Sequence, residues 1–193
     1  MKRFIIALVL MLLICVPARA VDTEAQTVIK GFHSHKLTES ISLFNNGNIF
    51  MNSGGYMAFL GYHGVNIQLN ESNTLFTLVG EKIDSKSAHL MGALWHSYSS
   101  ELISSFEDIE LWLPVAGTAE TRIYGFAMIT TPLFGGKLGI ATEHNIRPAT
   151  GNWDELAVGP IYDMGKTMLW AGYDFSPSKS DSDTIFVRTM VKL

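Results

Sequence analysis

The feature of this sequence that most constrains its fold is an alternation of apolar and polar residues with a period of two, from about residue 40 onward. In residues 167–176, Leu169, Tyr173 and Phe175 fall on one parity and Asp174 on the other. A strand places residues of one parity on one face, whereas a helix would scatter them around its circumference. The pattern therefore predicts β-structure.

Ten segments fit the alternation and are separated by short breaks rich in Gly, Pro, Ser and Asn, which favour turns. They span residues 40–50, 55–69, 73–83, 87–97, 107–115, 121–131, 137–145, 153–163, 167–176 and 185–193. Such breaks are too short for helical crossovers, so neighbouring strands are expected to be antiparallel. The run Asn45-Asn46-Gly47-Asn48 could itself be a hairpin turn, and the count falls to eight if the first two segments pack elsewhere. Residues 21–39 are expected to form an irregular or short helical lead-in.

The start of the chain has the three parts of a secretory signal. A basic tripeptide precedes the uncharged segment 4–16, and a small-x-small pattern follows at 18–20, which predicts cleavage after Ala20. The uncharged segment is shorter than the roughly 20 residues that a transmembrane helix needs. A lipoprotein signal ending at Cys15 is a weaker alternative, because Ile14 is bulky where such signals carry a small residue.

Composition sharpens this picture. The chain is 47 % hydrophobic and 17 % charged, which excludes a disordered tail, a coiled coil and a collagen-like chain. Cleavage would remove Lys2, Arg3 and Arg19 but no acid, leaving 11 basic and 18 acidic residues and a net charge of −7. This balance argues against nucleic acid as a partner. The single cysteine would also leave, so disulfides cannot stabilise the mature chain.

An antiparallel meander can remove its edge strands by closing into a barrel, here of about eight to ten strands over residues 40–193. A soluble calycin-like barrel would turn its apolar face inward around an apolar ligand. An outer-membrane barrel would turn that face to lipid. Mid-strand polar residues on the minority face favour the membrane barrel. So do aromatic residues near strand ends, such as Tyr56, Trp153 and Tyr162, and a chain that ends inside its last strand.

In its signal and its meander, the sequence resembles small bacterial outer-membrane β-barrel proteins. The resemblance implies outer-membrane lipid and the outer-membrane insertion machinery as partners, the latter through a final strand ending in Val191-Lys192-Leu193. Phe is the commoner last residue in such proteins. The short loops argue against an adhesin or receptor role. The lipid-facing residues expected are Leu111, Leu169, Tyr173, Phe175, Val187 and Leu193. The residues expected in the polar interior are Glu110, Arg122, Glu143, Glu155, Asp174 and Arg188.

These polar residues have two interpretations. They could line a small cation-preferring pore, or they could pair within a filled interior. The filled interior is favoured because barrels of about eight strands are just wide enough for side chains to fill them. His33-Ser34-His35 offers two imidazoles but no third ligand nearby, so we expect an exposed polar segment there and no metal site. No cofactor motif is present.

An enzyme acting on lipids is the least favoured reading. His96 and Ser97 are adjacent, so a strand would point them to opposite faces, and His89 and Ser87 share a face without an evident third group. No G-x-S-x-G pattern occurs. The sequence thus predicts a non-enzymatic outer-membrane barrel with a structural or narrow-channel role. The alternatives are a soluble periplasmic barrel that binds an apolar ligand and, less favoured, a lipid-modifying enzyme.

Overall fold

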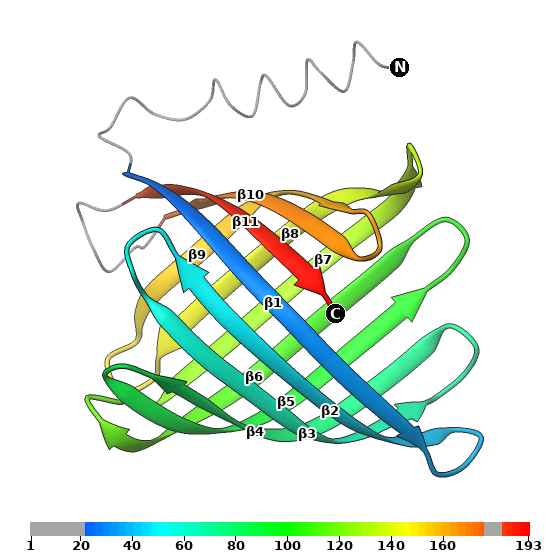
Figure 1. Ribbon diagram of the computed structural model, residues 1–193, viewed down its shortest axis with the longest axis horizontal. Coiled ribbons are helices and arrows are strands. Elements are labelled where there is room, and N and C mark those ends of the chain that lie inside the picture. The colour runs from blue at the N-terminus through cyan, green and yellow to red at the C-terminus, as the bar shows by residue number, and fades with distance from the viewer. Residues whose placement is uncertain (1–21, 176–182) are drawn as a thin grey trace.

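A computed structural model describes residues 22–175 and 183–193, which form one closed barrel of eleven strands (Figure 1). The predicted signal, residues 1–20, lies outside the described residues. The strands are β1 (Asp22–Lys36), β2 (Ile41–Asn52), β3 (Met57–Gln68), β4 (Asn73–Asp84), β5 (Ser87–Ser99), β6 (Ser104–Gly117), β7 (Arg122–Leu133), β8 (Gly136–Arg147), β9 (Asn152–Asp163), β10 (Thr167–Asp174) and β11 (Thr184–Lys192). The described residues include no helix long and apolar enough to cross a membrane.

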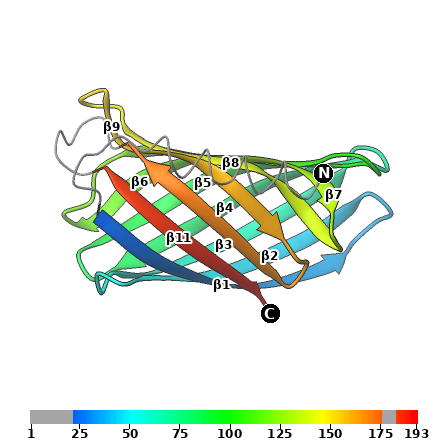
Figure 2. The ribbon, with the colours of Figure 1, turned by 90° about the horizontal axis from the view of Figure 1, so that it is seen from above.

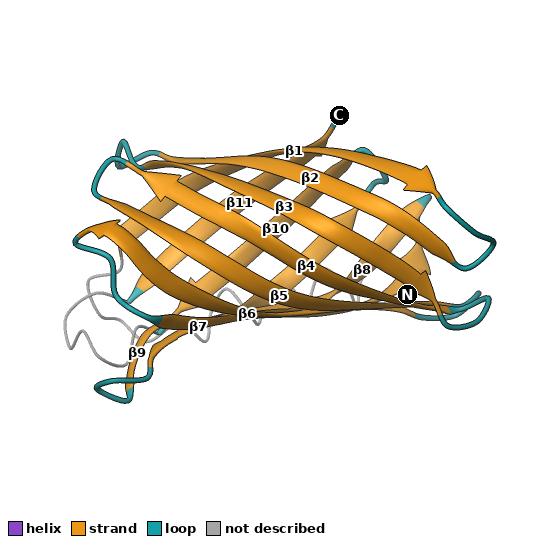
Figure 3. Ribbon diagram, turned by 90° about the horizontal axis from the view of Figure 1, so that it is seen from below, coloured by secondary structure: helices purple, strands orange, loops and turns teal. Residues whose placement is uncertain are grey.

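Each strand pairs with the next in antiparallel order, and β1 closes the ring against β11 in parallel. Because the strand count is odd, the first and last strands run in the same direction, as Figure 2 shows. We call the end where β1 begins the N end and the end where β11 finishes the C end. The β6–β7 turn lies at the N end, and Figure 3 shows the short connections at both ends.

The predicted class, an all-β up-and-down meander closed into a barrel, is confirmed, with eleven strands in place of eight to ten. The difference comes from residues 22–36, which form β1 and not an irregular lead-in. Its inward side carries Glu24, Gln26 and Lys30 beside Val28, and its outward side carries Ile29 among threonines, small residues and histidines. Both sides are therefore weakly apolar, and hydropathy does not separate them.

The Asn-Gly run in β2 is also a strand and not a hairpin turn. Asn46 and Asn48 are paired with Tyr62 and Leu60 of β3 on one side and with β1 on the other. Pairing on both sides satisfies the backbone and outweighs the turn preference of these residues. A two-residue hairpin does occur between β7 and β8, where Phe134 (φ 52°) and Gly135 (φ 79°) both adopt the left-handed conformation of a type I′ turn.

The barrel interior is filled with side chains. One buried cluster surrounds Trp170 and Phe186, and a second surrounds Tyr62, Trp95 and Trp112. Trp170 is fully buried, and its ring meets the Phe186 ring edge-on with centroids 4.8 Å apart. Such edge-to-face pairs add favourable interaction energy beyond burial. The outer surface carries the exposed leucines, isoleucines and valines, so the barrel has its apolar face outside.

Candidate functional site

The centre of the lumen holds a buried ion pair between strands far apart in the sequence. Arg188 of β11 places Nη1 2.7 Å from Oε2 of Glu143 on β8, and its Nε–H donates to Oε1 of Gln26 at 2.6 Å. The Tyr124 hydroxyl donates to Oε1 of Glu143 at 2.7 Å. The guanidinium also lies 4.8 Å from the centre of the Trp170 ring. A buried charge needs such partners because leaving water is costly.

A second polar group lies in the same interior, around Glu110 of β6. Glu110 is 1 % exposed, and its carboxylate accepts a hydrogen bond from the Tyr62 hydroxyl at 2.8 Å and from the Trp112 indole N–H at 2.6 Å. Asp108, two residues earlier on the same inward face, is also buried. The two acidic residues thus lie among aromatic rings and not along an open aqueous path.

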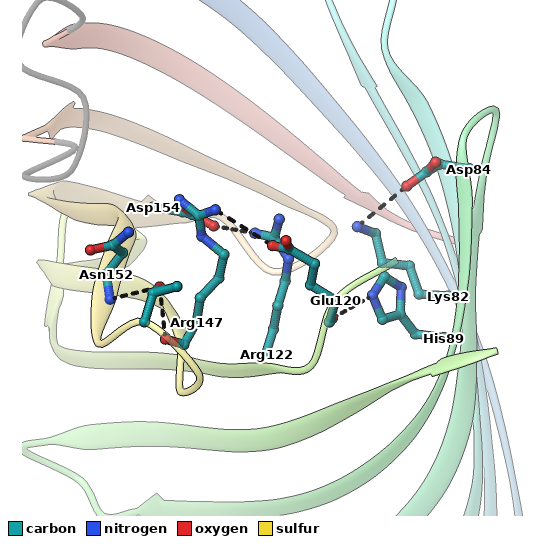
Figure 4. Close-up of polar contacts among 9 residues, drawn as sticks. Lys82, Asp84, His89, Glu120, Arg122, Arg147, Asn152 and Asp154 are labelled. Carbon is teal, nitrogen blue, oxygen red and sulfur yellow. Dashed lines mark hydrogen bonds and ion pairs between the residues drawn. The ribbon is translucent and has the colours of Figure 1, made fainter. Parts of the chain in front are cut away.

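The N end of the lumen carries a cluster of paired charges, which Figure 4 shows. Asp154 of β9 bridges two arginines, because its carboxylate oxygens lie 2.7 Å from Nη1 of Arg122 and 2.7 Å from Nη2 of Arg147. Arg147 also lies 3.5 Å from the Glu120 carboxylate in the β6–β7 turn. One carboxylate therefore ties β7, β8 and β9 together at this end of the barrel.

The other half of this cluster involves β4 and β5. Lys82 Nζ lies 3.5 Å from Oδ2 of Asp84 and 4.6 Å from the centre of the Trp112 ring. His89 is buried, and its Nε2–H donates to the Glu120 carbonyl at 3.0 Å, so the β6–β7 turn lies against the inner wall (Figure 4). In the β2–β3 turn, burial raises the pKa of the Tyr56 hydroxyl, which stays protonated and donates to Asp84 at 3.1 Å.

The charged side chains of the N-end cluster neutralise one another. Lys82, Arg122 and Arg147 each lie within 4 Å of a carboxylate, so none of them presents an uncompensated charge to the solvent. Within the described residues, no group of three histidine, cysteine, aspartate or glutamate side chains could hold a metal ion. The cluster can therefore hold strands and one turn together across the N end.

The six polar residues predicted for the interior all have inward parity, but the structure distributes them along the lumen. Glu143 and Arg188 form the central pair, and Glu110 belongs to the second polar group. Arg122 lies in the N-end cluster. Glu155 of β9 is half-buried. Asp174, at the end of β10, accepts a hydrogen bond from the backbone N–H of Leu156 at 3.1 Å.

The residues predicted to face lipid lie on the outer surface. Leu111 and Val187 are 44 % and 48 % exposed, and Leu169 and Phe175 are similarly accessible. Leu193 follows the end of β11 and is 82 % exposed. Tyr173 is half-buried, with its hydroxyl donating to Asp183 at 2.6 Å.

Several interior residues were missed by the sequence reasoning. Gln26 belongs to a segment that showed no alternation. Arg147 and Asp154 flank the β8–β9 turn, where the register shifts at Asn145/Ile146 and simple parity counting fails. Tyr62 could have been found, because it shares its parity with Ala58 and Leu60 in a recognised strand.

No protein-family model matches the chain, and no curated protein or solved structure is significantly similar to it.

Proposed function

We propose that this chain is a small outer-membrane β-barrel protein with a structural role and a closed lumen. The observation that carries the proposal is the polarity of the barrel wall. Leu111, Leu169 and Val187 lie outside, whereas Glu110, Glu143 and Arg188 are buried inside. In water this arrangement exposes apolar surface at a high cost, whereas in a bilayer the same surface is solvated by lipid.

Aromatic residues near the ends of the outer wall give further support. Trp153 and Phe175 lie near the N end, whereas Tyr98 and Tyr162 lie near the C end. Aromatic side chains favour the two interfaces of a membrane, where a ring can meet both the lipid tails and the headgroups. The predicted export signal is consistent with delivery to this location.

The lumen favours a structural role over a channel. Trp170 and Phe186 fill one part of the interior, and Tyr62, Trp95 and Trp112 fill another. A soluble calycin-like barrel would need an apolar cavity in this region, but the described interior contains buried ion pairs and aromatic rings. Because Arg188 is paired with Glu143 and the Glu110 carboxylate is hydrogen-bonded to Tyr62 and Trp112, these groups belong to the filled interior and do not line a water path.

Cell fractionation and gel mobility test this proposal. The mature protein is expected in the outer-membrane fraction, and it should migrate faster in unheated samples than in boiled ones because the barrel stays closed in the detergent. An inner-face control, Trp95→Phe, should retain both properties. Recovery of folded protein from the soluble periplasm without detergent would contradict the proposal.

A further inference from the structure

The barrel wall is lower at the end of β11 than along the neighbouring β1. β11 finishes at Lys192, whose register partner is Lys30, whereas β1 continues through residues 31–36 in pairing with β2. Figure 1 shows this step, with the chain end beside the middle of β1. The β9–β10 turn lies at the level of the step, because the Lys192 backbone N–H donates to the Lys166 carbonyl at 2.8 Å. In the described part of the chain, no strand pairs with the edge of residues 31–36 that faces away from β2, so the step is open from the side.

Three lysines lie around this step. Lys30 and Lys192 are register partners with inward parity, and the Leu193 backbone N–H donates to the Lys30 carbonyl at 2.8 Å. Lys166 joins them through the β9–β10 turn. Like charges on neighbouring strands repel one another. Lys192 Nζ lies 3.5 Å from the Asp163 carboxylate, but neither Lys30 nor Lys166 has a carboxylate within 4 Å among the described residues. The step therefore carries more positive than negative charge.

The polar surroundings of Lys30 do not balance its charge. Its register partner on β2 is the inward Asn48, which is 8 % exposed and whose side-chain oxygen is buried without a hydrogen-bond partner in the described structure. Asp108 and Glu143 attract Lys30 from farther than 4 Å, and Glu143 already pairs with Arg188. Buried polar groups normally have hydrogen-bond partners. An anion that carries a hydroxyl group relieves both the repulsion between the lysines and the unsatisfied amide.

The other turns at the C end do not share this positive charge. The β1–β2, β3–β4 and β5–β6 turns each contain one glutamate and no basic residue, namely Glu39, Glu71 and Glu101. The β7–β8 turn has no charged residue, whereas the β9–β10 turn contains Lys166 and no acid. The predicted mature chain is also acidic overall. The excess of positive charge is therefore local to the step and is not a property of the whole rim.

We infer that Lys30, Lys166 and Lys192 bind the phosphate group of an anionic lipid headgroup at this step. The inference rests on the proposed membrane location, in which strand ends and turns lie at the headgroup level. β9 and β11 end and β10 begins at the step, so the headgroups on this side of the barrel come down to the level of Lys30. Lysine ammonium groups bind phosphate as point charges, and lysines at a membrane surface attract anionic lipids.

Apolar side chains beside the step favour a lipid over free phosphate. Leu193 is 82 % exposed, and its backbone is hydrogen-bonded to Lys30. Leu169 of β10 has outward parity and is 40 % exposed close to the same strand ends. The acyl chains of a lipid can pack against these leucines while its phosphate contacts the ammonium groups. Inorganic phosphate would use the ammonium groups alone.

Native mass spectrometry of the detergent-solubilised protein tests this inference. The protein is mixed with equal amounts of phosphatidylglycerol, which is anionic, and phosphatidylcholine, which has no net charge. The wild type should retain phosphatidylglycerol in preference. Lys30→Gln/Lys192→Gln should weaken this retention by about tenfold or more, whereas Lys30→Arg/Lys192→Arg should keep it. The matched control is Lys86→Gln, which removes an exposed lysine from the β4–β5 turn at the N end and should leave the retention unchanged.

Lys166→Gln gives an independent result, because it changes an exposed turn residue and should weaken the retention while the heat-dependent gel shift is kept. Equal retention of the two lipids by the wild type, unchanged retention in Lys30→Gln/Lys192→Gln, or equal losses in Lys86→Gln and Lys166→Gln would overturn the inference. Binding of inorganic phosphate that phosphatidylglycerol does not displace would overturn it too, since it would show a site for the free anion. Cell fractionation reports separately on the membrane location, so an outer-membrane protein without lipid preference contradicts the lipid site alone.

Discussion

At the scale of the residue, the central ion pair compensates two charges that are buried in the lumen. Arg188 has Glu143 at 2.7 Å and Gln26 at 2.6 Å, with the Trp170 ring beside the guanidinium. Removing one member of a buried pair leaves the other charge without compensation, which costs more than the intact pair contributes. The stability of the barrel should therefore depend on the balance between the two residues more than on the presence of either one.

We predict that Glu143→Leu lowers the free energy of unfolding by about 3–5 kcal/mol, because Arg188 would lose its carboxylate partner inside the barrel. The double variant Glu143→Leu/Arg188→Met should be more stable than Glu143→Leu, since neither charge is then buried alone. Guanidinium unfolding in detergent micelles, followed by tryptophan fluorescence, measures both values. A double variant less stable than Glu143→Leu would contradict this account of the pair.

The inward positions of Glu110, Glu143 and Arg188 follow from strand parity, so the sequence could predict them without knowledge of their partners. Which residues meet is a different question, because it depends on the register of strands distant in sequence. Arg188 meets Gln26 because the two are register partners where β11 closes against β1, and it meets Glu143 of β8 across the lumen. The N-end cluster depends on the turns and on a register shift near Asn145. Neither feature produces a regular alternation of residues that could be recognised in the sequence.

At the scale of the element, closure depends on β1, the strand that the alternation did not reveal. It has β11 as a parallel partner and β2 as an antiparallel partner, so all of its backbone groups in the paired region lie between two strands. The later strands were recognisable because leucine, isoleucine and valine alternate with polar residues. In β1 the outward Thr23, Ala25 and Thr27 are too weakly apolar to mark a face.

We predict that Thr27→Pro prevents closure of the barrel. Thr27 is the register partner of Thr189 on β11 and of Met51 on β2. Proline removes a backbone donor from a strand paired on both sides, and such losses cost about 3 kcal/mol or more in regular structure. The matched control Thr27→Ser keeps the N–H. Unheated gels should lack the fast-migrating folded band for Thr27→Pro and retain it for Thr27→Ser, and equal mobility of the two would contradict the prediction.

At the scale of the whole molecule, the filled lumen predicts that the barrel does not conduct ions. Trp170 and Phe186 occupy its interior beside Arg188. We expect planar bilayers containing the wild-type protein to show no stable current steps. The double variant Trp170→Ala/Phe186→Ala should show them, because two large rings are removed next to a charge. Leu169→Ala, on the outer face of the same strand, is the control and should stay silent. Stable conductance in the wild type would show that water passes the rings.

The medium around the barrel can be tested by the depth dependence of a single charge on the outer wall. Leu111 lies near the middle of β6, and Ser105, with the same outward parity, lies near the C end of that strand. An arginine at the middle of a bilayer costs about 2–4 kcal/mol, and one near the interface costs about 0–1 kcal/mol. Leu111→Arg should therefore lower the free energy of unfolding in lipid vesicles by about 2–4 kcal/mol, with Ser105→Arg lowering it by less than about 1 kcal/mol. Guanidinium unfolding of the protein in vesicles measures both changes in the free energy of unfolding. Equal losses for the two variants would contradict the proposed membrane location, because the cost of a charge in a bilayer depends on its depth.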